Sequence, residues 1–368
     1  MTWIRIAIVL GIIALALQTA CYPPTLPLTP TPEPLVPTPR AMRTPTAIPT
    51  RSTQAIFTPP PTVTSPHRWR FGVGLALGHI TDYDLTWLSP GWYLDWQVRP
   101  PPEGLEIEYA PMVRVSEEGF RPNPQAILAA IDIMPGALWL LGNEPDVRWQ
   151  DNTTPESYAR HYHTLYTLIK GRDPTAQVAI AGLSQPTALR LRYLDRVLEA
   201  YEAMYGEPMP VDVWNIHAFI LREEANSWGV GIPPGFDDQQ GELYEIANHD
   251  DLEIFQRQII GFRYWMWTRG YQDKPLIVSE YGILMPPDYG FPFEAVRDFM
   301  WKTFDFFLNA RDEEIGYPGD NNRLVQRWCW YSLADTVYPT PNLFDPATRM
   351  ITPLGEAFGE YLRKLGNG

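Results

Sequence analysis

The stretch ALWLLGNEPD, residues 137–146, decides how the rest of this sequence is interpreted. An uninterrupted run of bulky apolar residues is typical of a short strand that is buried on both faces. The strand predicted over 138–143 ends directly before Glu144, and Pro145 fixes the chain that follows. A carboxylate at the end of a buried strand calls for an explanation, because a charge beside a core is costly unless it has a partner.

Similar apolar runs recur along the chain and alternate with amphipathic stretches. The pattern predicts strands over 71–76, 91–96, 107–113, 138–143, 177–182, 211–218, 275–280 and 327–333, and helices over 124–134, 155–170, 189–204, 252–269, 293–309 and 353–365. The helices between the first three strands are poorly defined. Strands that alternate with helices indicate right-handed crossovers and a parallel sheet, and eight such units favour a single (β/α)8 TIM barrel. A doubly wound open sheet is the alternative.

The N-terminal part of the chain is predicted to target and tether the protein. Residues 1–20 have the charge and the apolar run of a signal peptide, and this run is shorter than the roughly 20 residues that span a bilayer. A signal anchor is the alternative. LQTAC resembles the lipobox of bacterial lipoproteins, which implies lipidation of Cys21 and attachment to the outer face of a bacterial membrane, or secretion if Cys21 is not lipidated. Residues 21–66 are rich in Pro, Thr and Ser and are predicted to be a disordered linker, followed by one catalytic domain over 67–368.

Composition argues against several classes of protein. The formal net charge is −14 and the part after the linker has no basic run, so nucleic acid is not an expected partner. The two cysteines, Cys21 and Cys329, cannot build a disulfide framework, and the six histidines show no metal-ligand spacing. We therefore expect a monomer without a metal or an organic cofactor.

A second glutamate, like the first, lies at the end of a predicted strand. Glu280 ends the seventh predicted strand in KPLIVSEYG, and the fourth and seventh strands of an eight-stranded barrel face each other across its mouth. Two opposed carboxyl groups are the minimum equipment for cleaving a glycosidic bond. The alternative is that each glutamate caps a helix or pairs with an arginine.

These motifs resemble those of a known group of enzymes. GNEPD and VSEYG are similar to the acid/base and nucleophile motifs of clan A glycoside hydrolases, which are retaining TIM-barrel enzymes, and the similarity spans 71–365. GWYLDW, YAPMVRV, LLGNEPD and WNIHAF, in that order, resemble the catalytic core of family 128, with families 39 and 5 more distant. The resemblance implies that Glu144 is the acid/base, Glu280 the nucleophile and Asn143 a donor to the sugar 2-hydroxyl.

The resemblance and the strand ends together suggest further substrate-binding residues. His217 ends the sixth strand, where relatives carry a histidine that contacts the sugar or steadies the nucleophile. Many relatives have a tyrosine two residues later, but this chain has Phe219, and Tyr281 is a candidate substitute. Trp330 corresponds to a sugar-stacking tryptophan, and the platform could be extended by Trp92, Trp96, Trp149 and Trp228. Asp95 and Arg114 are either substrate-binding residues or a structural ion pair.

The sequence thus predicts a membrane-tethered retaining glycosidase that acts outside the cell on a β-linked polysaccharide or its oligosaccharides. Neither motif specifies the sugar, the linkage, or whether cleavage is internal or terminal. A carbohydrate-binding or adhesion protein that has lost catalysis is the main alternative. A lipid-anchored solute receptor is less compatible with the pattern, because the eight units offer no division into two lobes.

Overall fold

The computed structural model describes residues 66–366. The predicted signal peptide, Cys21 and nearly all of the predicted linker lie outside this range. Within it, no helix combines the length and the apolar character needed to cross a bilayer.

The strands and helices follow the predicted order closely. The strands are β1 (Phe71–Gly74), β2 (Trp92–Leu94), β3 (Glu108–Tyr109), β4 (Met112–Val115), β5 (Phe120–Arg121), β6 (Leu138–Asn143), β7 (Gln177–Gly182), β8 (Trp214–His217), β9 (Leu276–Tyr281) and β10 (Arg327–Trp330). The α-helices are α1 (Pro124–Ile133), α2 (Pro155–Arg172), α3 (Ala188–Tyr205), α4 (Leu252–Thr268), α5 (Phe293–Asn309) and α6 (Pro353–Gly366). The third predicted strand is divided into β3 and β4, and the short antiparallel β5 was not predicted.

The first two connections differ from a regular (β/α)8 pattern because neither contains an α-helix. Only the 3₁₀ turn Ile80–Asp82 lies between β1 and β2, and no helix lies between β2 and β3. Three consecutive prolines, Pro100 to Pro102, occupy the second connection. Proline lacks the backbone donor that a helix interior requires, so this segment cannot continue a helix.

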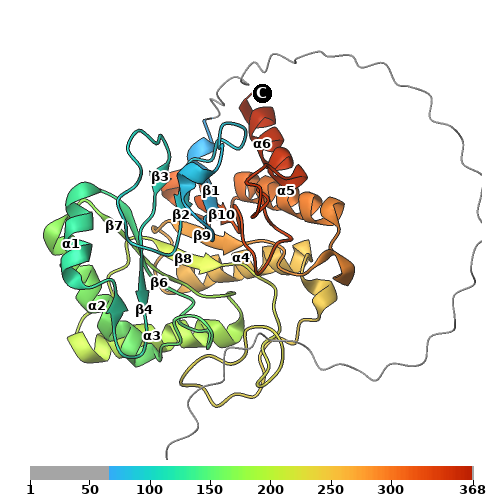
Figure 1. Ribbon diagram of the computed structural model, residues 1–368. Helices are drawn as coiled ribbons and strands as arrows, with labels where there is room; N and C mark the ends of the chain where they lie inside the picture. The colour runs from blue at the N-terminus through green and yellow to red at the C-terminus, as the bar shows by residue number, and fades with distance from the viewer. Residues whose placement is uncertain (1–65, 367–368) are drawn as a thin grey trace, which may run out of the picture. The chain divides into compact units, whose positions relative to one another are not determined.

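The strands form two sheets with a shared interior. One has the order β3-β2-β1-β10-β9-β8, the other β5-β4-β6-β7, and all pairings except β4–β5 are parallel. Only residues 110 and 111 separate β3 from β4, and isolated bridges such as Leu183↔Ile216 connect β7 to β8. The described residues therefore have a TIM-barrel-like arrangement with helices around the strands (Figure 1), although no single continuous closed ladder is formed.

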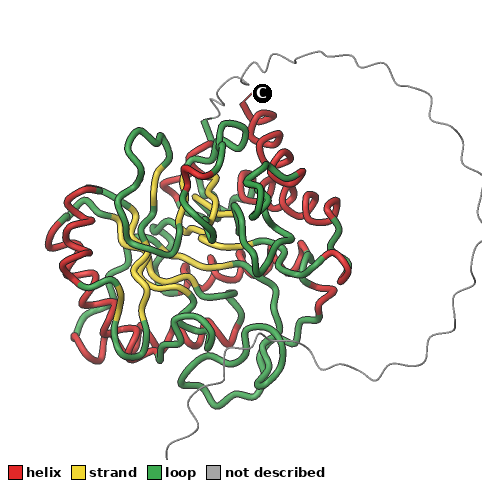
Figure 2. The backbone as a smooth tube through the Cα atoms, in the orientation of Figure 1, coloured by secondary structure: helices red, strands yellow, loops and turns green. Residues whose placement is uncertain are grey.

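Alternate strand residues pack into two different clusters. In β6, Leu138 and Leu140 belong to an inner cluster that also contains residues of β2, β4, β9 and β10, whereas Trp139 and Leu141 belong to the cluster that includes the helices. Both faces of the strand are therefore buried, as the sequence pattern predicts. The long connection from β8 to α4 extends away from the strands (Figure 2).

Candidate active site

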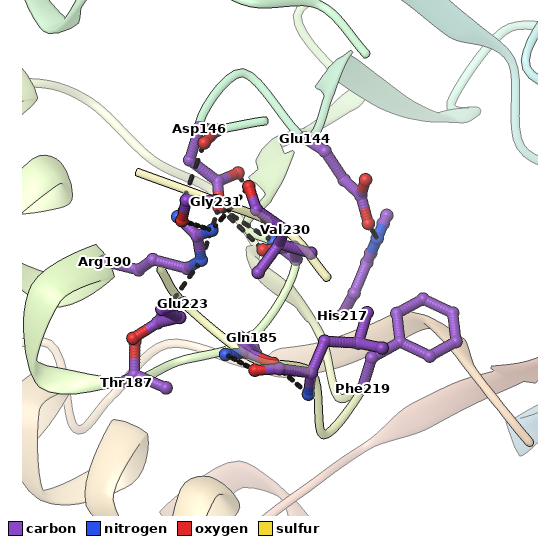
Figure 3. Close-up of polar contacts among 12 residues, drawn as sticks. Glu144, Asp146, Gln185, Thr187, Arg190, His217, Phe219, Glu223, Val230 and Gly231 are labelled. Atoms are coloured by element: carbon purple, nitrogen blue, oxygen red, sulfur yellow. Dashed lines mark hydrogen bonds and ion pairs between the residues drawn. The ribbon is translucent and has the colours of Figure 1, made fainter. Parts of the chain in front are cut away.

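Glu144 follows the last residue of β6 and adopts an unusual backbone conformation. Its φ angle is 45°, in the left-handed region that non-glycine residues rarely occupy. Its backbone amide donates to the Gly182 carbonyl at 3.0 Å, and its Oε1 lies 2.8 Å from Nδ1 of His217 (Figure 3). The turn therefore directs the carboxylate towards the ends of β7 and β8.

Glu280 points into the site because β9 breaks its alternation. The pairing with β8 passes from Val278 directly to Glu280, and the pairing with β10 passes from Val278 to Tyr281. Such an irregularity re-aims side chains, a common feature beside active sites. Glu280 accepts a hydrogen bond from Nε1 of Trp96 at 2.6 Å, while Tyr281 points to the helices and packs on Phe307 of α5.

His217 lies between the two carboxylates. Its Nδ1 faces Glu144, and its Nε2 is 3.4 Å from Oε1 of Glu280. The imidazole is fully buried, and its ring occupies the space that a side chain at Gly182 would fill. One carboxylate oxygen of each glutamate and one ring nitrogen of His217 all lie within 4.8 Å of one another.

Trp96 and Tyr331 form an aromatic wall beside Glu280. Trp96 also has a left-handed backbone, with φ of 56°, and its ring lies against Gly74 at the end of β1. The ring centroids of Trp96 and Tyr331 are 5.8 Å apart, and Tyr331 also contacts Phe219 at 6.4 Å. Tyr331 was not singled out from the sequence, although it directly follows the predicted Trp330.

The pKa values of Glu280 and His217 are both shifted upwards in the site. Burial raises the pKa of the Glu280 carboxyl to about 7, and the charge of Glu144 adds to this, while His217 and the Trp96 hydrogen bond oppose it. Burial alone would lower the pKa of His217, but the two carboxylates outweigh it and leave that pKa above its ordinary value. The Glu280 carboxyl thus holds its proton at a pH where an isolated carboxyl group has lost it.

The raised pKa of Glu280 predicts a specific dependence of stability on pH. Between about 4.5 and about 7 the folded protein retains a proton that the unfolded chain has released, so the free energy of unfolding should fall as pH rises. The contribution is at most about 3 kcal/mol, since one pKa unit corresponds to about 1.4 kcal/mol. Denaturant unfolding at a series of pH values should show Glu280→Gln gaining stability relative to the parent across this window. A difference that does not change with pH would refute the assignment.

Gly182 is predicted to be intolerant of any side chain. A Cβ at this position would lie 2.4 Å from Cδ2 of His217, so Gly182→Ala must displace the imidazole from Glu144. We expect a loss of about 1–3 kcal/mol in the free energy of unfolding, the usual cost of overpacking. Gly261→Ala is the control: Gly261 lies within α4 with no atom close to its added Cβ, and the variant should gain about 0.5–1 kcal/mol. Equal stabilities in urea unfolding would contradict this account.

Two other predicted residues lie close to the carboxylates. Asn143 precedes Glu144; its backbone amide donates to Asp151 at 2.7 Å, and its Oδ1 is buried without a hydrogen-bond partner. Arg114 pairs with Asp151 at 2.6 Å, and its positive charge is felt at Glu280. Arg114 is thus part of an ion pair, but its partner is Asp151 rather than Asp95.

Three side chains that were predicted to bind the substrate lie in the core. Trp330 is fully buried, donates to the Pro341 carbonyl at 2.9 Å and packs edge-on against Tyr281. Tyr281 is equally buried, against the helices. Trp92 belongs to the inner cluster, with Arg327 over its ring. None of the three exposes its ring to a sugar: Trp330 and Tyr281 pack towards the helices, and Trp92 packs into the inner cluster.

Within the described residues, none of the remaining candidates forms a hydrogen bond or an ion pair with Glu144 or Glu280. Asp95 is buried, pairs with Arg99 and accepts from the Tyr109 hydroxyl at 2.6 Å, which supports the structural alternative. Trp149 lies on the loop after β6 and is 73% exposed, so its ring is available to a ligand. Trp228 is half-buried in a small cluster with Phe219 and Tyr331.

The same side chains could also hold a metal ion. Glu144, His217 and Glu280 offer two carboxylate oxygens and one imidazole nitrogen, a donor set that suits zinc. The hydrogen bonds of Glu144 to His217 and of Glu280 to Trp96 already engage one oxygen of each carboxylate. The arrangement thus supports chemistry by the carboxyl groups themselves.

The fold and the paired carboxylates define a class of protein: a TIM-barrel-like α/β protein with two acidic side chains at the carboxyl ends of its strands. No family model and no curated protein sequence matches this chain. Solved structures do match. An endo-β-1,3-glucanase of glycoside hydrolase family 128, subgroup II, from Pseudomonas viridiflava is 16% identical with a TM-score of 0.56, covering 79% of this chain and 96% of its own.

Two further structures extend the comparison. A subgroup I endo-β-1,3-glucanase from Amycolatopsis mediterranei, in complex with laminaritriose, is 17% identical with a TM-score of 0.52 and covers 79% of this chain and 99% of its own. A subgroup VII oligosaccharide-binding protein from Cryptococcus neoformans is 14% identical with a TM-score of 0.53, covering 82% and 96%. At such identities the likeness establishes the shared fold.

Proposed function

We propose that this protein is a retaining glycoside hydrolase that cleaves β-linked glucans, of the clan A type. The observation that carries the proposal is the approach of a Glu144 oxygen and a Glu280 oxygen to within 4.8 Å on either side of His217. Retaining enzymes hold their two carboxyl groups about 5–5.5 Å apart, whereas inverting enzymes leave space for a water molecule and separate them by roughly 6.5–9.5 Å.

The surroundings of each glutamate support a division of roles. Glu280 faces two N–H-bearing groups, Trp96 and His217, which stabilise a carboxylate that attacks the anomeric carbon. Glu144 then protonates the departing oxygen and later removes a proton from the incoming water. The pair needs one shared proton to begin. Burial raises the pKa of Glu280 in the free protein, and His217 contacts one oxygen of each glutamate, so it can carry a proton between them.

A β-1,3-glucan is the substrate that the comparisons favour. The glucanases from Pseudomonas viridiflava and Amycolatopsis mediterranei are both described as endo-β-1,3-glucanases, and the second was solved with laminaritriose. Aromatic rings beside Glu280, those of Trp96 and Tyr331, supply the apolar faces on which a pyranose packs.

A hydrolysis screen tests the proposal. The protein would be incubated with β-1,3-, β-1,4- and mixed-linkage glucans, xylan and mannan, and the products would be separated by chromatography. We expect oligosaccharides from the β-1,3-glucan and little or no product from xylan and mannan. Product from none of the five polysaccharides would refute the function.

A second candidate is an oligosaccharide-binding protein without catalysis. The structure from Cryptococcus neoformans is described as such a protein, and Phe219 stands where many relatives have a tyrosine that supports the nucleophile. Phe219 is buried against Tyr331 and the ring of His217, so it donates nothing to Glu280. Calorimetric titration with β-1,3-gluco-oligosaccharides that shows binding without any product would favour this function.

The location of the enzyme is part of the proposal. A signal peptide over 1–20, a lipidated Cys21 and a Pro/Thr-rich linker would tether the domain outside the cell, at a distance from the membrane. Mass spectrometry of the N-terminal peptide would detect the lipid on Cys21, and an unprocessed N-terminus would exclude this arrangement.

A further inference from the structure

The segment 184–190, which follows β7 and includes the first residues of α3, contributes no side chain to the cluster of Glu144, His217 and Glu280. It nevertheless bonds to the chain just after Glu144 and to the chain just after His217 (Figure 3). The two loops that it joins are the ones whose side chains meet in the 2.8 Å contact between Glu144 and His217.

Arg190 is the centre of this connection. Its side chain is fully buried, with Nε 3.3 Å from Oδ2 of Asp146 and 3.0 Å from Oε1 of Glu223. The guanidinium also donates to the backbone carbonyls of Asp146, Val230 and Gly231 at 3.4, 3.3 and 3.1 Å. One side chain therefore binds the loop after β6 and the long loop after β8 at the same time.

Three uncharged side chains of the segment add hydrogen bonds to the same loops. Ser184 donates to Asp146, from its hydroxyl at 2.9 Å and from its backbone amide. The side-chain amide of Gln185 pairs with both backbone groups of Leu221 at 2.8 Å, and the Thr187 hydroxyl donates to Glu223 at 2.6 Å. Leu221 and Glu223 follow His217 within a few residues, so these hydrogen bonds hold the loop near the end of β8.

The backbone of Glu144 explains why such a support is needed. A non-glycine residue with φ of 45° keeps this conformation only where its surroundings hold it. Asp146, two residues further on, is fully buried, and a buried carboxylate cannot leave its cation without a large penalty. We propose that Arg190, together with Asp146 and Glu223, is a positioning group that fixes the acid/base Glu144 relative to His217. Its effect on turnover rests on the proposed hydrolase function.

The alternative is that the ion triad only stabilises the fold. Comparing substrates with a poor and a good leaving group distinguishes this structural role from a positioning role. A misplaced general acid slows the departure of a poor leaving group such as phenolate, but it hardly affects dinitrophenolate, which departs without a proton. A smaller amount of folded enzyme would slow both reactions by the same factor.

The experiment uses a triple variant, Arg190→Met with Asp146→Asn and Glu223→Gln, which removes the triad without leaving a buried charge unpaired. Rates would be measured with phenyl and 2,4-dinitrophenyl β-glycosides of a β-1,3-linked glucose disaccharide. We expect the phenyl glycoside to lose at least about tenfold more in kcat/KM than the dinitrophenyl glycoside, because kcat/KM reports the transfer of the sugar to Glu280 and not the later attack of water. Arg172→Met, which removes an exposed bidentate pair with Asp132, should change neither. Equal losses, or no loss, in the folded triple variant would overturn the proposal.

Gln185→Ala provides a second test, because it loosens the loop of His217 without changing any charge. Its expected effect is the same difference between the two leaving groups, and it decides the question if the triple variant does not fold. If the parent cleaves no glycoside, the proposed function has failed and the titration of the His217 imidazole, followed by NMR, becomes the readout. Positioning predicts a lower pKa of His217 in Gln185→Ala, and an unchanged pKa would overturn it.

Discussion

Replacing Glu280 by Gln is expected to reduce the cleavage of a β-1,3-glucan by roughly 10⁴-fold or more, the scale seen when a nucleophile is removed. Gln has nearly the same shape and can still accept the hydrogen bond from Trp96, so the packing around β9 should be preserved. It cannot form the glycosyl ester, and this loss applies to every substrate whatever its leaving group.

Steady-state rates with a β-1,3-glucan and with a dinitrophenyl glycoside measure the effect. Glu294→Gln is the matched control, because Glu294 is exposed in the first turn of α5 and the substitution is chemically the same. Residual activity within tenfold of the parent in folded Glu280→Gln would show that another group is the nucleophile.

Replacing Glu144 by Gln should give a different kinetic pattern from replacing Glu280. Cleavage of the glucan should fall by on the order of 10²–10⁴-fold, because its leaving oxygen needs a proton. A dinitrophenyl glycoside should still transfer its sugar to Glu280, and only the attack of water on this ester should be slow, since it lacks the general base.

Rapid mixing of Glu144→Gln with the dinitrophenyl glycoside should therefore release a burst of dinitrophenolate, followed by a slow steady state. Azide, a nucleophile that requires no general base, should accelerate the slow phase. Glu280→Gln is the internal comparison and should show no burst. If Glu144→Gln slows both leaving groups equally and azide has no effect, Glu144 is not the acid/base.

Most of the fold could be predicted because it depends on local patterns. Apolar runs such as 138–143 and amphipathic stretches such as 155–170 report burial directly, and each coincides with an element of the structure. The two connections without an α-helix were poorly defined in the sequence as well, and the prolines of the second one explain its lack of a helix. The incomplete pairing between β7 and β8 leaves no local trace, since it depends on contacts between distant segments.

The site was predicted less completely, because it depends on which way each side chain points. Glu144 and Glu280 could be found because both end apolar runs. Trp330 and Tyr281 were placed at the site by position in the motif, but alternation along β10 and the irregularity in β9 turn them to the helices. A single-residue irregularity reverses every orientation that follows it, and the letters VSEYG do not reveal it.

The sequence also failed to reveal some contacts that the structure shows, and Trp96 is one example. The sequence suggested only a sugar platform, but the left-handed backbone of Trp96 also brings its Nε1 to the Glu280 carboxylate. Arg190 and Asp146 had no signal at all, since an arginine in a helix and an aspartate after a proline are expected at a surface. Only the folded chain brings them together in the interior.

The central claim is that Glu144 and Glu280 lie close enough to act in two displacements at one sugar carbon. Proton NMR of the first product formed from a β-1,3-gluco-oligosaccharide tests it most directly, because the anomeric signals distinguish the two stereochemical outcomes before mutarotation mixes them. Our account predicts that the β-anomer appears first. First appearance of the α-anomer would show a single displacement by water and would contradict it.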